Sequence, residues 1–132
     1  MGAAGSVIAR FLQKNPEIKE ILCFVRNIEK AKEFLPDGFK KISIRKIILP
    51  EDKSKFIKNI SGSDLLINAA SYKINAEVMD AAFKAKVNYL DLASYFLRSP
   101  HVEQFDFDKK FKEFNLQGLI DAGAARRGFL IF

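Results

Sequence analysis

The run Ile21-Leu22-Cys23-Phe24-Val25 decides the fold class, because it is apolar at every position. A strand with one solvated face alternates apolar and polar residues, whereas a strand buried on both faces of a parallel sheet is apolar throughout. Asn27, two residues after the run, is a residue type that commonly caps a helix. The stretch therefore predicts a buried strand followed by a helix, which is the repeating unit of parallel α/β sheets.

The same alternation continues along the chain. Other apolar runs predict strands at 42–49, 65–69, 89–92 and 116–121. Helical spacing of apolar residues predicts helices at 6–14, 27–35, 50–60, 75–86 and 103–114. We therefore expect an α/β fold, with a parallel sheet covered by helices on both faces.

The composition is that of one folded domain. The 132 residues are 48% hydrophobic with only four prolines and seven glycines, which argues against disorder and leaves little room for a second domain. No apolar run approaches the roughly 20 residues of a membrane span. The lone Cys23 cannot form an internal disulfide and lies mid-strand, so we expect a packing residue. No secretory leader is evident, so we expect a cytoplasmic protein.

The basic excess does not predict a nucleic-acid partner. The chain has 22 Lys and Arg against 16 Asp and Glu, a net charge of +6. The lysines mostly alternate with acids, as in Glu29-Lys30-Ala31-Lys32-Glu33, a pattern typical of solvated helix faces. We therefore expect neither a nucleic-acid nor a membrane partner.

The N-terminal residues carry the first functional motif. Met1-Gly2-Ala3-Ala4-Gly5 leads directly into a predicted helix, and Gly-x-x-Gly at this place is the second half of the dinucleotide fingerprint Gly-x-Gly-x-x-Gly. Glycine lets the backbone approach a pyrophosphate, and the helix N-terminus favours its negative charge. The series also begins with a helix, although a strand normally precedes the first helix of such a fold.

A second feature lies about twenty residues downstream, at the end of the first predicted strand. An acid at this place would bind the ribose hydroxyl of NAD, whereas an arginine pairs with the 2′-phosphate of NADP. Arg26 occupies the position and favours NADP, with NAD as the alternative. An ordinary exposed arginine after a strand explains the same residue equally well.

Four blocks carry a resemblance to a known family, at residues 2–12, 26–31, 66–71 and 87–92. In this order and spacing they resemble the cofactor domain of saccharopine dehydrogenase and its relatives. Those relatives include saccharopine reductases, lysine dehydrogenase-like proteins and carboxynorspermidine synthases. The resemblance implies a Rossmann-like doubly wound parallel sheet that binds a nicotinamide dinucleotide.

The resemblance also implies the cofactor-binding residues. Gly2 and Gly5 would line the pyrophosphate and Arg26 the ribose phosphate. Asn68, Ala69 and Ala70 would lie beside the cofactor, and Asp91 near its nicotinamide end. Two alternatives stay open from the residues alone: Asn68 could satisfy loop backbone groups, and Asp91 could cap a turn. The sequence does not identify the catalytic residues, and it predicts no metal-binding residue.

The chain departs from the family at both ends. The family's opening strand and first glycine precede the position of Gly2, and in the doubly wound order 3-2-1-4-5-6 this first strand is the central one. After Ala122-Gly123 the relatives continue into a large substrate domain, which we do not find in this sequence. We therefore expect residues 1–132 to form a single incomplete NAD(P)-binding domain, without its central strand and without a substrate domain.

The expected function follows from these points. The chain would be the dinucleotide-binding domain of an oxidoreductase acting on amino-acid or imine substrates, inactive alone, so whether it is an enzyme stays open. The alternative is a non-catalytic fragment or interaction module without cofactor. Exposed sheet edges would allow a homo-oligomer. The apolar tail 129–132 could fill the place of the central strand.

Overall fold

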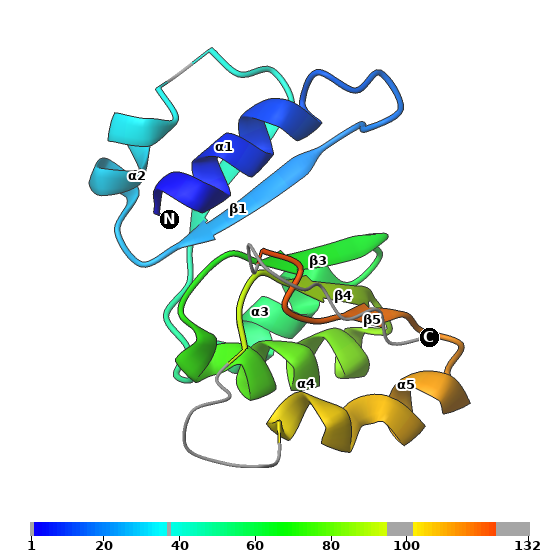
Figure 1. Ribbon diagram of the computed structural model, residues 1–132. Coiled ribbons are helices and arrows are strands. Elements are labelled where there is room, and N and C mark those ends of the chain that lie inside the picture. The colour runs from blue at the N-terminus through cyan, green and yellow to red at the C-terminus, as the bar shows by residue number, and fades with distance from the viewer. Residues whose placement is uncertain (1, 37, 95–101, 124–132) are drawn as a thin grey trace. The chain divides into compact units, whose positions relative to one another are not determined.

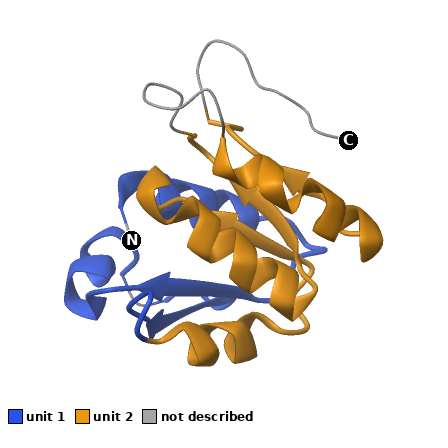
Figure 2. Cartoon of the chain, turned by 90° about the horizontal axis from the view of Figure 1, so that it is seen from below, with its two compact units in different colours: residues 1–51 blue, residues 52–132 orange. Residues whose placement is uncertain are grey.

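The computed structural model describes residues 2–36, 38–94 and 102–123, in which helices and strands alternate along the chain (Figure 1). The chain divides into two compact units, residues 1–51 and 52–132 (Figure 2). Every strand pair in both units is parallel. The predicted α/β class is therefore confirmed. The tail 129–132, for which the sequence suggested a place in the sheet, lies outside the described residues.

The first unit contains two helices and a two-stranded sheet. In chain order these are α1 (Ala3–Leu12), β1 (Ile21–Val25), α2 (Ile28–Phe34) and β2 (Ile42–Lys46). β1 has the bounds that its apolar run predicts, because the run is bordered by polar residues on both sides. The side chain of Asn27 accepts a hydrogen bond from the Lys30 N–H at 3.0 Å, which confirms the predicted cap of α2.

The core of the first unit centres on β1. Cys23 is buried with Ala9 of α1 and with Leu35, and Ile42 and Ile44 of β2 pack against them. Burial raises the pKa of the Cys23 thiol above its ordinary value. The thiol is therefore held in its neutral form and packs as a small apolar group, as its mid-strand position predicts.

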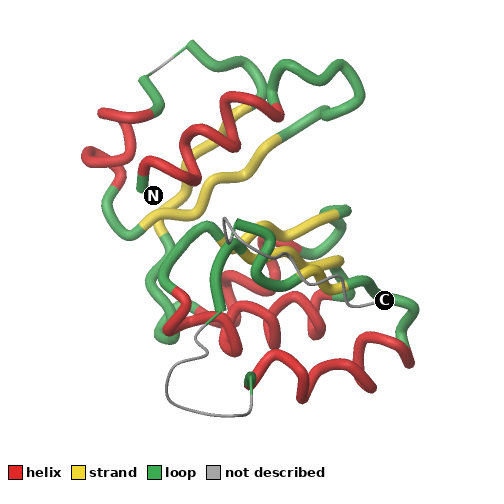
Figure 3. Tube along the Cα trace, in the orientation of Figure 1, coloured by secondary structure: helices red, strands yellow, loops and turns green. Residues whose placement is uncertain are grey.

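The second unit contains a three-stranded sheet with helices (Figure 3). Its elements are α3 (Lys53–Ile60), β3 (Leu65–Asn68), α4 (Asn75–Ala85), β4 (Asn88–Asp91), α5 (Asp108–Glu113) and β5 (Gly118–Leu119). Short 3₁₀ helices at Tyr72–Ile74 and Glu103–Phe107 precede α4 and α5. The buried core is built mainly from apolar side chains of the helices and of one sheet face, namely Phe56, Ile60, Val78, Met79, Tyr89, Phe111 and Ile120.

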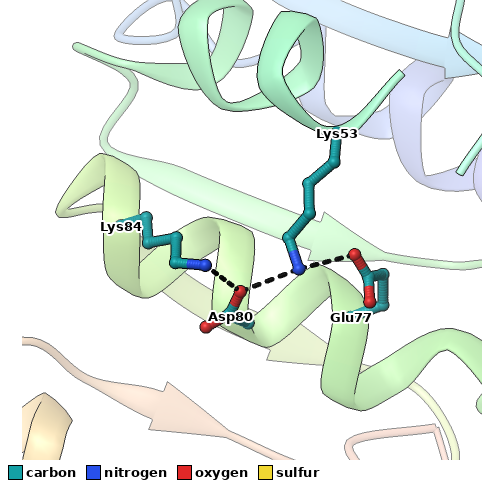
Figure 4. A network of polar contacts seen from close by, with 4 residues as sticks. All are labelled: Lys53, Glu77, Asp80 and Lys84. Carbon is teal, nitrogen blue, oxygen red and sulfur yellow. Dashed lines mark hydrogen bonds and ion pairs between the residues drawn. The ribbon is translucent and has the colours of Figure 1, made fainter. Parts of the chain in front are cut away.

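An ionic network joins α3 to α4 (Figure 4). The Lys53 ammonium lies 2.6 Å from Glu77 Oε1 and 2.9 Å from Asp80 Oδ2, and Lys84 reaches the same Asp80 oxygen at 2.8 Å. The hydrogen bond to Glu77, followed by that to Asp80, raises the pKa of Lys53. Burial alone would raise the pKa of Asp80, but Lys84 and Lys53 lower it below its ordinary value.

The pairing order of the strands fits a doubly wound sheet without its central strand. The hydrogen-bonded orders are β1-β2 and β3-β4-β5. Removing strand 1 from the order 3-2-1-4-5-6 leaves a pair, 3-2, and a triplet, 4-5-6, which these sheets match. Within the described residues, β1 pairs only with β2 and β3 only with β4. The pairing order within each unit therefore agrees with the predicted Rossmann-like class.

Several predicted boundaries are wrong at the edges of elements. α1 begins at Ala3 instead of residue 6, because the extended Gly2 serves as N-cap and alanines propagate the helix. β2 ends at Lys46 instead of residue 49. The Ile47 N–H still donates to the carbonyl of Val25, which is the last residue of β1, so the parallel ladder of this pair ends here.

The carboxyl-terminal segment differs more from the prediction. The helix expected over 103–114 is a 3₁₀ helix followed by the six-residue α5. The strand expected over 116–121 has ladder pairing only at Gly118 and Leu119, opposite Tyr89 and Leu90. After Leu119 the regular ladder is interrupted, because the Asp121 N–H bonds to the Asp91 carboxylate. The Ala122 and Gly123 N–H groups bond again to the backbone carbonyls of Asp91 and Leu92. None of the described helices is long and apolar enough to cross a membrane.

Candidate functional site

The N-terminus of α1 presents backbone N–H groups that no side chain caps. Gly2 is the N-cap, with φ −97° and ψ −177°, and it makes no side-chain capping bond. The first turn contains no acidic residue. A Cβ atom added at Gly2 would meet no atom within 4 Å, so the packing of the protein itself does not require glycine there. The open, uncapped helix end has the properties that favour an anion such as a phosphate.

Gly5 occupies a different environment from Gly2. It lies inside the first turn of α1 and is buried together with Ser6 and Ala9, whereas Gly2 is exposed. The Ser6 hydroxyl donates to the Ala3 carbonyl at 2.7 Å, so this hydroxyl is used within the helix. The small buried face allows α1 to lie close to the core of its unit. Contact of Gly5 with a pyrophosphate stays a prediction.

Arg26 directly follows β1 and is exposed. In Figure 1 the carboxyl end of β1 and the N-terminus of α1 lie at the same end of the first unit. Within the described residues, Arg26 forms no hydrogen bond or ion pair that would hold its guanidinium in place. An arginine so placed is able to form the bidentate bonds that a phosphate monoester accepts.

The second unit places polar side chains at the carboxyl ends of its strands. Asn68 and Asp91 are the last residues of β3 and β4, and they lie opposite each other in the ladder. Both side chains are buried on the sheet face that also carries Tyr89. The Asn68 amide and the Asp91 carboxylate both approach the Tyr89 hydroxyl, at 3.5 and 3.0 Å. The Tyr89 hydroxyl thus connects Asn68 and Asp91, which the sequence analysis proposed as cofactor-binding residues.

Asp91 has no exposed surface, and its carboxylate accepts three hydrogen bonds from the described part of the chain. The donors are the Tyr89 hydroxyl at 3.0 Å, Gln104 Nε2 at 3.2 Å and the Asp121 backbone N–H at 2.7 Å. The side chain therefore connects the end of β4 to the segment after β5 and to the 3₁₀ helix before α5. Contact of Asp91 with a nicotinamide stays a prediction, and it would require these donors to move.

Asn68 likewise satisfies a loop backbone group. Its Oδ1 accepts from the Ala70 N–H at 3.1 Å, and its Nδ2 donates to Asn75 Oδ1 at 2.8 Å. Ala69 is half-buried and Ala70 is exposed, so the loop after β3 reaches the surface at the carboxyl end of the strands. In parallel α/β sheets this is the end at which ligands bind.

Burial raises the pKa of the Tyr89 hydroxyl far above its ordinary value, and the neighbouring Asp91 charge raises it further. Tyr89 therefore remains protonated and acts as a donor to Asp91. The described residues also hold no group of three or more His, Cys, Asp or Glu side chains that could bind a metal ion.

Asn68, Tyr89 and Asp91 form part of a larger polar cluster. The cluster also contains three residues to which the sequence pattern assigns no role, namely Asn75, Ser94 and Gln104. Asn75 donates from Nδ2 to the Ala93 carbonyl at 2.7 Å, and Gln104 Nε2 lies 3.1 Å from the Ser94 hydroxyl. One signal was present: Asn75 lies three and four residues before Val78 and Met79, and so shares their buried stripe. A polar residue on an apolar stripe indicates a buried hydrogen-bond partner.

A parallel α/β fold, an uncapped helix end at a glycine and an arginine after the next strand are typical of the dinucleotide-binding class of proteins. Residues 1–115 match the family model described as the saccharopine dehydrogenase NADP binding domain. The chain belongs to this family, and the resemblance seen in the sequence is confirmed.

Two relatives illustrate the match. Carboxynorspermidine synthase of Vibrio cholerae is 30% identical over an alignment that covers 92% of this chain and 34% of that protein. Carboxyaminopropylagmatine dehydrogenase of Synechocystis is 30% identical, over 92% of this chain and 32% of that protein. The chain thus spans about a third of the length of these curated relatives.

A solved structure has the same fold. Apo histidine-tagged saccharopine dehydrogenase (L-Glu forming) from Saccharomyces cerevisiae superposes with a TM-score of 0.74. The superposition covers 91% of this chain and 25% of that protein, at 14% sequence identity. At this identity the comparison supports the Rossmann-like fold alone.

Proposed function

We propose that this chain binds NADP and that it forms the cofactor-binding part of an oxidoreductase acting on amino-acid or imine substrates. Gly2 and Gly5 at the start of α1 would bind the pyrophosphate, and Arg26 the 2′-phosphate. The loop 68–70 and the end of β4 at Asp91 would lie beside the rest of the cofactor. On this proposal, residues 1–132 act as one NAD(P)-binding domain.

The proposal rests on the uncapped N-terminus of α1 and on the exposed position of Arg26. α1 has no capping side chain at Gly2, and Arg26 is exposed after β1 without a partner among the described residues. A dinucleotide with a 2′-phosphate offers anionic groups that both features can bind. NAD lacks the 2′-phosphate, so Arg26 favours NADP over NAD.

The names of the relatives support the proposed reaction class. One is a synthase and another a dehydrogenase of carboxylated amines, so a substrate with an amine or imine carbon fits the family. When bound, NADP supplies hydride transfer, and the protein's part is to bind and orient it. Within the described residues, Asp91 and Tyr89 are buried and bonded to each other, so neither is exposed to act as an acid or base. We therefore propose that this chain alone does not complete a reaction.

Titration of the purified chain with NADPH and with NADH tests the proposal. Binding is followed by the fluorescence of the reduced nicotinamide and checked by calorimetry. We expect saturable binding of NADPH that is tighter than binding of NADH. Lack of saturable binding by either nucleotide would overturn the proposal and favour a module without cofactor. Tighter binding of NADH would overturn the role of Arg26 only.

A further inference from the structure

The oxygen and the nitrogen of the Asn75 carboxamide both form hydrogen bonds within the second unit. Oδ1 accepts from Asn68 Nδ2 at 2.8 Å, and Nδ2 donates to the Ala93 carbonyl at 2.7 Å. Only 4% of the residue is exposed. Asn75 is the first residue of α4; its partners are Asn68, the last residue of β3, and Ala93, in the segment that follows β4. One buried side chain therefore joins the end of β3 to the loop after β4.

Asn75 also decides which way the Asn68 amide points. Because Asn75 Oδ1 accepts a hydrogen bond, it faces the NH₂ group of Asn68. The carbonyl oxygen of Asn68 is then directed to the Ala70 N–H, at 3.1 Å. The conformation of the loop after β3 thus depends on a chain of contacts from Asn75 through Asn68 to the backbone of Ala70.

We propose that Asn75 is a positioning residue for cofactor binding. It holds the loop 69–71 after β3 and the loop 92–94 after β4 in their bound-state positions, although it does not itself contact the cofactor. The inference rests on the proposed function, because these loops lie at the strand ends where a nucleotide binds in a parallel sheet. When the loops are already ordered in the free protein, binding does not have to supply the conformational entropy of ordering them.

Asn88 offers a matched control. It is also an asparagine in the second unit with both amide ends in use: Nδ2 donates to the Asp64 carbonyl at 3.0 Å, and Oδ1 accepts from the Gln117 N–H at 2.9 Å. It lies at the first position of β4, whereas Asn75 acts at the carboxyl ends of the strands. Loss of either amide removes two hydrogen bonds, but only those of Asn75 lead to the two loops, directly at Ala93 and through Asn68 to Ala70.

The experiment compares Asn75→Ala with Asn88→Ala in the full chain. Hydrogen exchange of the Ala70 amide, followed by NMR, reports the loop, and NADPH fluorescence reports the dissociation constant. We expect Asn75→Ala to speed Ala70 exchange and to weaken NADPH binding by about tenfold. Asn88→Ala should lower the unfolding midpoint while leaving the NADPH dissociation constant within about twofold, since it leaves both loops in place.

The outcomes separate this inference from the proposed function. An NADPH dissociation constant unchanged in Asn75→Ala, or weakened equally in both variants, overturns the positioning role. Failure of the unmodified chain to bind NADPH overturns the proposed function, and an unchanged Ala70 amide in a chain that does bind overturns only the inference. If Asn75→Ala does not fold, Asn75→Asp keeps the acceptor for Asn68 and removes the donor to Ala93. It should weaken NADPH binding in the same direction.

Discussion

The Tyr89 hydroxyl donates to Asp91 Oδ2 at 3.0 Å, so two residues of one strand are joined on its buried face. They are two positions apart in β4 and therefore point to the same side of the sheet. Tyr89 is 1% exposed and Asp91 is 0% exposed, so the carboxylate lies in the interior. Its bonded neighbours among the described residues include no cation. Such a group is stable only while its hydrogen bonds are intact.

Tyr89→Phe removes this donor while keeping the ring. We expect the free energy of unfolding to fall by about 1–3 kcal/mol, because Asp91 loses one of its three donors in a buried site. Urea denaturation followed by circular dichroism measures the change. A variant as stable as the unmodified chain would show that the remaining donors, Gln104 and the Asp121 N–H, suffice for the carboxylate.

Gly123 is a position where any side chain would collide with the backbone. An added Cβ would lie 2.7 Å from the Leu92 carbonyl oxygen and 3.0 Å from Leu92 Cβ. The Gly123 N–H also donates to this carbonyl at 3.0 Å. Gly123→Ala should therefore lower the free energy of unfolding by about 1–3 kcal/mol, because the strand end must shift.

Gly118→Ala is the control for this prediction. Its Cβ would approach Met79 Cε at 3.3 Å, which is the end of a flexible side chain that can move away. We expect an effect below about 1 kcal/mol in the same urea experiment. Equal losses in both variants would contradict the argument from the Leu92 carbonyl.

The pKa of Asp80 predicts how stability depends on pH. Lys84 and Lys53 lower this pKa below 3.8 against the effect of burial, so the folded protein binds a proton at Asp80 less readily than the unfolded chain does. The contribution is therefore present above about pH 4 and is lost as the pH falls through the lowered pKa. Because the side chains are partly exposed, we expect about 0.5–1 kcal/mol.

Asp80→Asn should remove this dependence. Urea denaturation at pH 6 and pH 3 should show a smaller acid-induced loss for the variant than for the unmodified chain. Asp108→Asn serves as control, because its pair with Lys112 is more exposed, at 38% and 63% of the side chains. If the unmodified chain and Asp80→Asn lose the same free energy of unfolding between pH 6 and pH 3, the proposed role of the network is refuted.

Arg26→Ala tests the choice between the two nucleotides. Because a charged hydrogen bond contributes about 1.5–3 kcal/mol, we expect NADPH affinity to fall by about tenfold to a hundredfold. NADH has no 2′-phosphate, so its affinity should be unchanged. Lys58→Ala, which removes an exposed charge of the same sign from α3, should alter neither. Titration by nucleotide fluorescence distinguishes a specific contact from a general charge effect.

Much of the local structure was predictable because its causes are local. The bounds of β1 and the cap of α2 at Asn27 follow from neighbouring residues, and so does the order of helices and strands. The motif at Gly2 and the position of Arg26 were visible for the same reason. Both depend on spacings of a few residues or on one strand–helix unit.

The polar cluster of the second unit was not predictable, because its contacts join distant segments. Asp91 bonds to Gln104 and to the Asp121 N–H, thirteen and thirty residues away. Asn75 bonds to Ala93, eighteen residues away. Hydrophobic periodicity shows which face of a helix is buried, but not which polar groups meet there.

The α/β class, the family and the candidate residues for binding a dinucleotide could be predicted from the sequence, because they are encoded in local apolar runs and short motifs. The full burial of Asp91, the pairing of β5 at just two residues and the bonds of Asn75 to Asn68 and Ala93 became visible in the folded structure. A buried polar group is defined by its hydrogen-bond partners, which come from distant segments. Those partners are brought together only when the strands and helices pack.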